Sequence, residues 1–389
     1  VGDKVYAADT DGTVFVVRAS AEFELLAENV MEEVIHATPA LMDGRVYIRT
    51  EEHLYCIGSG EALRGAQPYP TWEEMLTEWP SFRGPGGTGV AHFTNAPVTW
   101  DVEAGTNVKW QVEVPRLGFN SPVVWGERLF ISGADAEVRE VYCYDTESGE
   151  LLWTTVLEPF DGTPTKPVDV MEDTGFAAST LVAHGKQLFA IFATGDIVAL
   201  DFDGNIQWGY NLGLPDNHYG HSSSLLAYNN LVYVQYDQNE EELSKLYALD
   251  AATGKAVWTQ GREKISWASP MLADTNVGRQ LILVSEEDVD AYDPLTGSRL
   301  WQVKCLGGEV APSPAYADGI VFAANEYAVA AGIRLSGSES MVETELLYEY
   351  DDYLPEVSSP VGDGERFYFV TSMGDVVALD AEAGEEVWA

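Results

Sequence analysis

One hydrophobic pattern recurs along this chain. Short runs in which apolar and polar or small residues alternate are separated by turns rich in Asp and Gly. In each clear copy an alternating run leads to an Asp, a Gly-bearing turn and a second run that ends in Trp. Such a pattern is typical of a β-hairpin. The clear copies are Val141–Trp153, Ile197–Trp208, Leu246–Trp258, Val289–Trp301 and Val376–Trp388.

The closing tryptophans set the length of the repeat. They are Trp110, Trp153, Trp208, Trp258, Trp301 and Trp388, and the variant Leu346–Tyr348 fills the place missing between the last two. The period is roughly 40 to 55 residues, which leaves room for four short strands, as in the blade of a propeller. A second recurring piece precedes each hairpin, namely a Ser/Thr-Pro-like strand, a turn and an apolar strand. Its copies include Asn120–Ile131, Ala268–Val284, Ser313–Ala323 and Ser358–Val370, with degenerate copies at Val5–Val17 and Thr38–Ile57.

These repeats predict an all-β chain that forms a single eight-bladed β-propeller over residues 1–389, with four-stranded antiparallel blades. The first blade is expected to be incomplete, because no innermost strand is recognisable before Val1. One long insertion, Gly58 to Thr106, interrupts the second blade, and a stretch of this length is normally functional or a linker. The predicted blades are 1–30, 31–114, 115–158, 174–213, 217–263, 265–306, 308–350 and 354–389.

The most repeated residues have a structural explanation. A Trp at the end of an outer strand can cover the Gly-containing turn of the adjacent blade and bury on the order of 200 Å² there. Asp accepts backbone N–H groups in turns, and Gly supplies positive φ. We therefore expect all six tryptophans to act in blade docking.

The net charge limits the partners. The chain has 63 acidic against 21 basic residues, a formal net charge of −42. Such a surface repels nucleic acid and anionic lipid, and it suits saline solution, cations or a basic protein partner. No apolar run is long enough to cross a bilayer, so membrane insertion is not expected. The scattered acidic residues favour a solvated extracellular surface.

The repeat resembles that of the PQQ-binding-like β-propeller family over essentially the whole chain. Trp79–Pro85, Asn107–Trp110 and Ser121–Gly126 resemble the opening of exported bacterial members, which implies an extracytoplasmic location. In those relatives the Trp79–Gly84 element comes near the start, whereas Val46–Ile57 resembles the end. The reversed order leaves three readings: a slice of a tandem array, a permuted chain, or a first blade completed by a neighbouring molecule. An open strand edge invites strand addition, so we hypothesise self-assembly through this gap.

The same resemblance implies what a quinoprotein dehydrogenase would need. It would hold PQQ over the axis with an adjacent, disulfide-bonded cysteine pair, a Trp beneath the cofactor, Glu/Asn/Asp ligands for calcium and an Asp base. Cys56, Cys143 and Cys305 are far apart and show no CxxC spacing. We expect Cys56 and Cys143 to be buried apolar residues, and we do not expect bound PQQ.

Residues beside the Ser-Pro elements should line the channel and are the candidates for ligand binding. They are Asn120, His218, His221, Trp267, Glu309 and Glu356. The close pair His218 and His221 could provide a base or a metal ligand, although hydrogen bonding at a strand start is the simpler role. Trp267 could plug the axis or form the floor of a pocket. No catalytic residue is predicted.

Calcium is the remaining candidate metal. Asp9 and Asp11, and likewise Asp201 and Asp203, precede Gly in sequences like the start of a calcium loop. The twelfth positions hold Ser20 and Leu212 instead of the required glutamate. Both segments lie where hairpin turns are expected, and turns alone favour Asp and Gly. We therefore favour a structural role in the turns over specific calcium binding.

Together these features predict a noncatalytic extracellular or cell-surface binding or scaffolding propeller whose partner is a protein or a copy of itself. The alternatives are a quinoprotein dehydrogenase using PQQ and calcium, and a periplasmic scaffold of the outer-membrane-assembly type. The fold itself does not decide among them.

Overall fold

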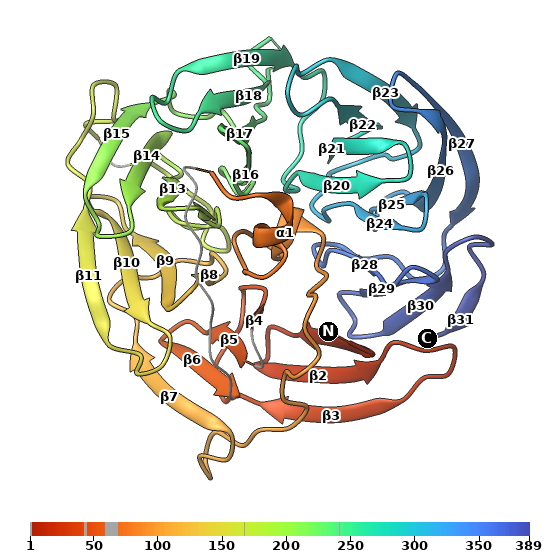
Figure 1. Ribbon diagram of the computed structural model, residues 1–389, viewed down its shortest axis with the longest axis horizontal. Coiled ribbons are helices and arrows are strands. Elements are labelled where there is room, and N and C mark those ends of the chain that lie inside the picture. Colours follow the sequence, from red (N-terminus) through yellow and green to blue (C-terminus); the bar gives the residue numbers. More distant parts are fainter. Residues whose placement is uncertain (1, 43–44, 59–68, 167, 241) are drawn as a thin grey trace.

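The computed structural model describes the chain except residues 1, 43–44, 59–68, 167 and 241. Its sheets stand as blades around a central axis (Figure 1). Within the described residues there are eight antiparallel sheets, seven of four strands and one of three. The predicted eight-bladed β-propeller is therefore confirmed. Part of the predicted insertion, residues 59–68, lies outside the described residues.

The strands follow one another outward from the axis in each blade. The first blade consists of β1 (Lys4–Ala8), β2 (Thr13–Arg18) and β3 (Leu25–Val30). The second and third consist of β4 (Ala40–Met42), β5 (Arg45–Arg49), β6 (His53–Gly58), β7 (Val108–Glu113), and β8 (Val123–Trp125), β9 (Arg128–Ala134), β10 (Arg139–Asp145), β11 (Leu151–Val156). The fourth and fifth consist of β12 (Val182–His184), β13 (Gln187–Ile191), β14 (Asp196–Asp201), β15 (Ile206–Asn211), and β16 (Leu226–Tyr228), β17 (Leu231–Tyr236), β18 (Lys245–Asp250), β19 (Ala256–Gly261).

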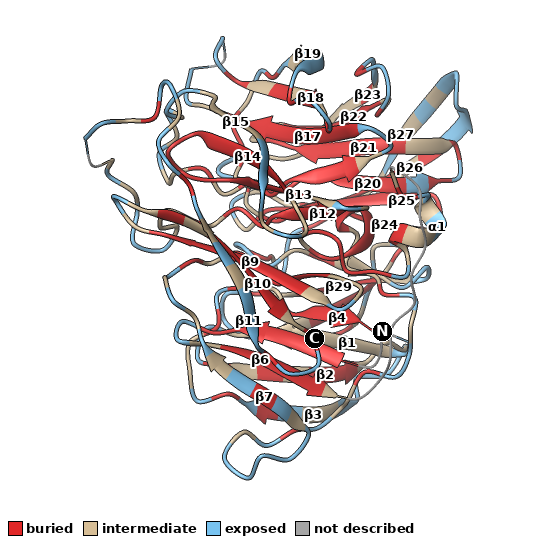
Figure 2. Cartoon of the chain, turned by 60° about the vertical axis from the view of Figure 1, so that its left-hand side comes forward, coloured by how far each residue is buried: buried red, intermediate tan, exposed pale blue. Residues whose placement is uncertain are grey.

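The last three blades repeat this order. They consist of β20 (Met271–Thr275), β21 (Gly278–Val284), β22 (Asp288–Tyr292), β23 (Arg299–Lys304); β24 (Ala315–Ala317), β25 (Ile320–Ala324), β26 (Ala330–Ser338), β27 (Met341–Tyr350); and β28 (Val361–Gly362), β29 (Arg366–Val370), β30 (Val376–Asp380), β31 (Glu386–Trp388). The second and third strands of most blades are largely buried, whereas most residues of the outer strands are exposed or half-buried (Figure 2). The prediction that each outer strand ends at its Trp is wrong, because Trp is the third residue of β7, β11, β15, β19 and β23 and the strand continues beyond it.

The outer-strand tryptophans dock each blade onto the next. The indole N–H of Trp110 donates to Thr146 O at 3.1 Å, and that of Trp208 donates to Ala251 O at 2.8 Å. A methyl group at Gly149 would lie 2.6 Å from the Trp110 ring, so only glycine permits this contact. Trp153 and Trp258 cover Gly204 and Gly297 in the same way.

Two places depart from this rule. Trp301 donates to Gln280 Oε1 of its own blade at 2.8 Å. Tyr348 takes the Trp place in the seventh blade, where its ring covers Gly384 and its hydroxyl donates to Ala381 O at 3.1 Å. The docking pattern therefore tolerates an aromatic ring other than indole.

Within the described residues the first blade consists of three strands. Strand β1 pairs with β2 on one side and forms the edge of the sheet on the side toward the axis. None of the described helices is long and apolar enough to cross a bilayer.

Candidate functional site

A segment of the insertion fills the axis of the propeller. Trp79 and Val124 exchange backbone hydrogen bonds of 3.1 and 2.8 Å, and Pro80 O accepts the Ala183 N–H at 2.8 Å. This segment therefore forms backbone hydrogen bonds with the inner strands of two blades. We call residues 79–89 the plug.

Glycines let the plug approach the inner strands. Gly86 has φ +62°, and a Cβ there would lie 2.2 Å from Leu272 O. Gly87, with φ +71°, would place a Cβ 3.0 Å from Pro270 O. A larger residue would force the plug away from the blades. Glycine is therefore required at these positions for close packing.

Arg83 is the buried cation of the plug. Its guanidinium donates to Pro314 O at 3.0 Å and also to Pro360 O, the carbonyls that directly precede β24 and β28. Burial lowers the pKa of Arg83 to about 9, because the charged form loses its hydration. This guanidinium joins two adjacent blades at the axis.

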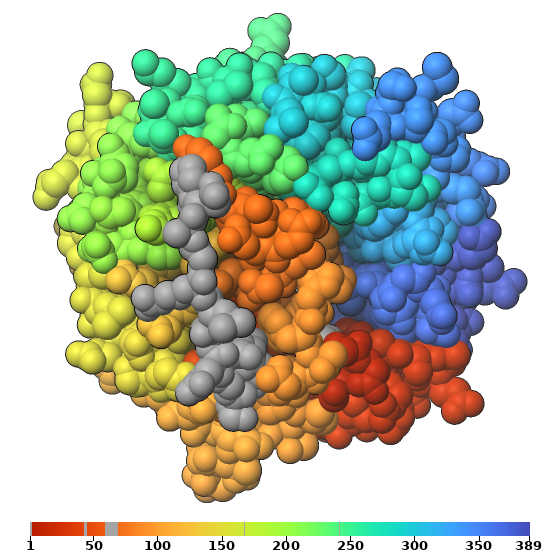
Figure 3. Space-filling view, viewed as in Figure 1, coloured from red at the N-terminus to blue at the C-terminus, as the bar shows by residue number. Residues whose placement is uncertain are grey.

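The short helix α1 (Trp72–Met75) covers one mouth of the channel. Thr71 and Glu74 form a reciprocal capping box at its start. The Arg279 guanidinium lies 4.4 Å from the centre of the Trp72 ring, a cation–π contact that fixes α1 over the fifth and sixth blades. Figure 3 shows this segment, in orange, over the centre of the disc.

The opposite mouth gathers aromatic and acidic side chains, because it is formed by residues that precede the inner strands. The Tyr219 and Trp267 rings meet edge to face with centroids 5.0 Å apart, and Tyr219 OH donates to Glu309 Oε2 at 2.7 Å. That hydrogen bond raises the pKa of Tyr219. Trp267 Nε1 in turn donates to Asn217 Oδ1 at 2.6 Å.

More exposed residues flank this group. The centroids of the His218 and Tyr219 rings lie 4.8 Å apart. The negative charge of Glu356 also contributes to the raised pKa of the Tyr219 phenol. Tyr327 is 66% exposed beside Gly308, and Val357 is 67% exposed. We call Trp267, Tyr219, Glu309, His218, Glu356, Tyr327 and Val357 the aromatic mouth. The structure thus brings together four of the six candidate ligand-binding residues.

The other two candidates are buried inside the blades. Asn120 is fully buried, accepts from Arg49 Nη1 at 2.7 Å and donates to Ala177 O at 2.8 Å. His221 is 2% exposed and packs against Tyr236, and burial lowers its pKa to about 4. Asn120 therefore joins blades, and His221 lies in the core beneath the mouth. Tyr219 and Tyr327 were not predicted, because nothing in the repeat marks these loop positions.

The three cysteines do not form the adjacent pair that the family resemblance implies for a PQQ site. Cys56 lies in β6, Cys143 in β10 and Cys305 after β23, and each thiol is free. Burial raises the pKa of Cys56 to about 11. No cluster of three or more potential metal-ligating side chains occurs in the described part of the chain.

The aspartates of the two calcium-like turns bind their own backbone. Asp9 Oδ1 accepts the Thr13 N–H at 2.7 Å. Asp201 Oδ1 accepts the N–H groups of Asp203 and Asn205 at 3.0 and 2.9 Å. Desolvation raises the pKa of Asp201, but hydrogen bonds from the Asn205 side chain and from these N–H groups outweigh it, and the pKa is lowered. The Asp203 carboxylate pairs with Arg128 at 3.1 Å, and Asp11 is exposed in the first turn. These contacts are those of Asp-stabilised hairpin turns.

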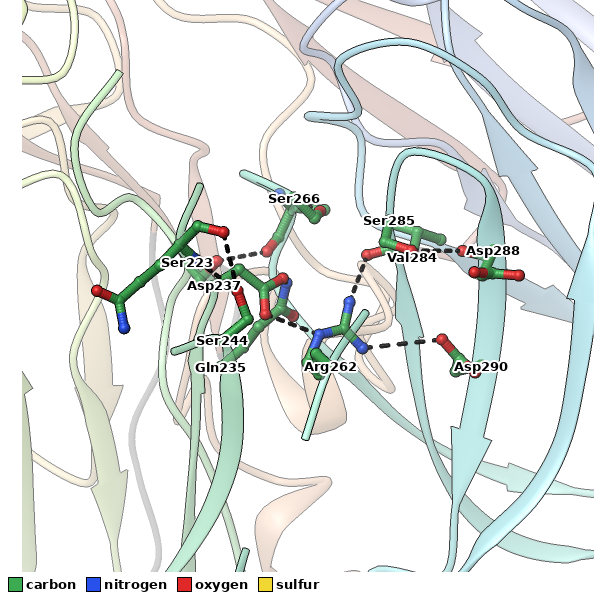
Figure 4. Close-up of polar contacts among 12 residues, drawn as sticks. Ser223, Gln235, Asp237, Ser244, Arg262, Ser266, Val284, Ser285, Asp288 and Asp290 are labelled. Atoms are coloured by element: carbon green, nitrogen blue, oxygen red, sulfur yellow. Dashed lines mark hydrogen bonds and ion pairs between the residues drawn. The ribbon is translucent and has the colours of Figure 1, made fainter. Parts of the chain in front are cut away.

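A buried ion-pair network joins the fifth and sixth blades (Figure 4). Arg262 Nε donates to Asp237 Oδ1 at 2.8 Å, and Nη2 donates to Val284 O at 3.0 Å. Asp290 Oδ2 lies 3.9 Å from Nη1, and burial raises the pKa of Asp290 to about 6. These groups are shielded from solvent, so the network holds blades together and is not a ligand site.

A cavity of about 540 Å³ lies beside α1, lined by Pro70, Glu78, Trp125, Lys186, Phe202 and neighbouring residues. Glu78 Oε2 accepts the Gly126 N–H at 2.8 Å, while burial raises the pKa of Glu78 to about 7. The hydrogen bond favours the ionised form, but desolvation is the larger effect.

Comparisons with known proteins agree with this architecture. The family model described as outer membrane protein assembly factor BamB matches residues 90–219 and 218–389. The crystal structure of BamB from Moraxella catarrhalis is similar, with a TM-score of 0.61 and 16% identity over 97% of this chain and 94% of that one. A quinohemoprotein alcohol dehydrogenase from Comamonas testosteroni has a TM-score of 0.48 and 12% identity over 100% of this chain and 65% of that one. None of the curated proteins matches. The chain therefore belongs to the PQQ-type propeller family whose model is described as outer membrane protein assembly factor BamB.

Proposed function

We propose that this protein is a noncatalytic, extracytoplasmic propeller that binds a protein partner and acts as a scaffold. The observation that carries the proposal is the plug. Arg83 and the plug glycines fill the axis with the chain's own atoms, while the aromatic mouth remains exposed at the other end. The filled axis favours recognition of a protein at the exposed surfaces over binding of a reacting small molecule at the axis.

The aromatic mouth suits a basic protein surface. Tyr and Trp are enriched in the centres of protein interfaces, where they bury area at low entropic cost. Glu309 and Glu356 flank Trp267 and could pair with Lys or Arg of the partner, and the rings offer cation–π contacts. The net charge of −42 would also accelerate encounter with a basic partner.

The proposed scaffold could bind either of two kinds of partner, another protein or a second copy of this chain. The family description, outer membrane protein assembly factor, favours a scaffold for membrane-protein assembly in the periplasm. Self-association through the incomplete first blade is the other form, and light scattering would report it as a mass of two or more chains. The alternative function is that of a quinoprotein dehydrogenase. The separation of the three cysteines argues against it, because they cannot form an adjacent pair.

The aromatic mouth can be tested directly. The double variant Trp267→Ala/Tyr327→Ser removes the half-buried indole and the exposed phenol ring of the mouth, and it should abolish co-purification of the partner from native cells after chemical cross-linking. Met341→Ser on the outer strand β27 removes a side chain that is also exposed, 69%, and should leave the partner bound. Alcohol-dependent dye reduction by the purified protein after addition of PQQ and Ca²⁺ would contradict the proposal.

A further inference from the structure

The cavity beside α1 lies where the insertion meets the third and fourth blades. Its walls are the segment that contains α1, the β8–β9 turn of the third blade, and the β12–β13 and β14–β15 turns of the fourth blade. Its volume of about 540 Å³ lies within the range of small-molecule sites. No residue of the plug lines it, so the cavity is a place for a ligand apart from the filled axis.

Two aromatic side chains form apolar walls of this cavity. Trp125 ends β8 and pairs with Arg128 across the β8–β9 hairpin. Phe202 is fixed in the β14–β15 turn, because its ring centroid lies 4.9 Å from that of Phe130 and its carbonyl oxygen accepts the Trp153 indole N–H at 2.9 Å. Both Trp125 and Phe202 are half-buried. They offer aromatic faces, which pack against apolar groups and attract cations.

The described residues that line the cavity carry more negative than positive charge. Five of them are carboxylates and two are cations. Asp203 pairs with Arg128 at 3.1 Å, and Glu74 caps the start of α1. Asp201 accepts the N–H groups of its own turn, and the second cation, Lys186, is exposed. The excess of carboxylates favours a positively charged ligand over a neutral or negative one.

Glu78 is the buried acceptor of the cavity. Its side chain lines the cavity, although the residue is only 6% exposed. Oε2 accepts the Gly126 N–H at 2.8 Å, whereas no described residue donates to Oε1 or forms an ion pair with this carboxylate. A buried carboxylate without a cation is costly, and a cation that donates a hydrogen bond to it offsets that cost. Oε1 is therefore available to a charged donor that enters the cavity.

We propose that this cavity binds a small organic amine, in which a primary ammonium group is joined to an apolar stem. The ammonium group would donate to Glu78 Oε1, and the stem would contact Trp125 and Phe202. A metal ion suits the cavity less well, because no group of three potential metal ligands occurs in the described part of the chain. The cavity is separate from the aromatic mouth, and this inference goes beyond the proposed function.

Benzylamine and benzyl alcohol are matched probes, because they share a ring and differ in charge. A ligand of this size exchanges with solution, so each probe is titrated into the whole chain by isothermal calorimetry. The pH is held above the Glu78 pKa of about 7, where the carboxylate is ionised. We expect saturable binding of benzylamine and about tenfold weaker binding of benzyl alcohol, since the charged hydrogen bond is lost. Equal affinity for the two probes, or no binding of benzylamine, would overturn the inference.

Three variants locate the site. Glu78→Gln keeps the shape of the side chain and removes its charge, and it should weaken benzylamine binding about tenfold. Glu343→Gln, on the outer strand β27, removes an exposed carboxylate elsewhere and should leave binding unchanged. Lys186→Met removes a competing cation and should strengthen binding, a gain that damage to the fold would not produce. Unchanged affinity in Glu78→Gln, or weaker binding by Lys186→Met, would overturn the inference.

Discussion

The indole N–H of Trp388 donates to the carbonyl oxygen of Ser20 at 3.2 Å, across 368 positions of sequence. Phe23 meets the same ring edge to face, with centroids 4.9 Å apart. The last blade thus docks onto the incomplete first blade with the contact that joins most other neighbours. This outer contact joins the two ends of the described chain and closes the ring of blades.

Trp388→Ala should therefore loosen the first blade. Loss of a buried aromatic side chain typically costs 3 to 5 kcal/mol, so a reduction of about that size is expected in the free energy of unfolding. Amide exchange should accelerate most in β1–β3, because they lose the Trp388 contact with the last blade. Equal acceleration in all blades would contradict a closing role, and Trp388→Phe should recover most of the stability while losing the hydrogen bond.

The plug should be sensitive to a single methyl group. Gly86→Ala places a Cβ 2.2 Å from Leu272 O, whereas Gly105→Ala meets nothing within 4 Å. The two glycines have φ of +62° and +67°, so the conformational penalty is matched. We expect Gly86→Ala to lower the free energy of unfolding by about 2 kcal/mol more than Gly105→Ala, measured by urea denaturation. Equal losses would mean that the plug is not tightly docked.

The buried pair of Arg262 and Asp237 should depend on both partners. Arg262→Met leaves the Asp237 carboxylate buried without its guanidinium, and breaking such a pair typically costs 3 to 5 kcal/mol. Adding Asp237→Leu removes the isolated carboxylate and should recover much of the loss. A double-mutant cycle on the melting transition measures the coupling, and simple additivity would argue against the network.

Glu78 should make stability fall as the pH rises. Its pKa of about 7 in the folded chain lies above the ordinary 4.5, so the ionised form is disfavoured by folding. The penalty is absent below about pH 4 and complete above pH 7. Glu78→Gln should therefore stabilise the protein at pH 8 by roughly 2 to 3 kcal/mol and have little effect at pH 4. Parallel stability curves for the two proteins would contradict this assignment.

The fold could be predicted because each blade repeats its own signals. Asp, Gly and Trp recur at fixed offsets, and their roles are local or involve only the next blade. The plug was harder to predict, since Arg83 binds carbonyls more than 230 residues away and no local pattern marks such partners. Part of the aromatic mouth could be predicted, because Trp267 and Glu309 lie shortly before recognisable inner strands, whereas Tyr327 lies in a turn that no repeated pattern marks.

Native mass spectrometry of the protein isolated from its own source tests the central claim most directly. A single chain or a protein complex without a small-molecule adduct, with the partner lost from Trp267→Ala/Tyr327→Ser, is the result that a noncatalytic scaffold predicts. A single chain that carries an adduct of the mass of PQQ and calcium would contradict it and would make the channel mouth an active site.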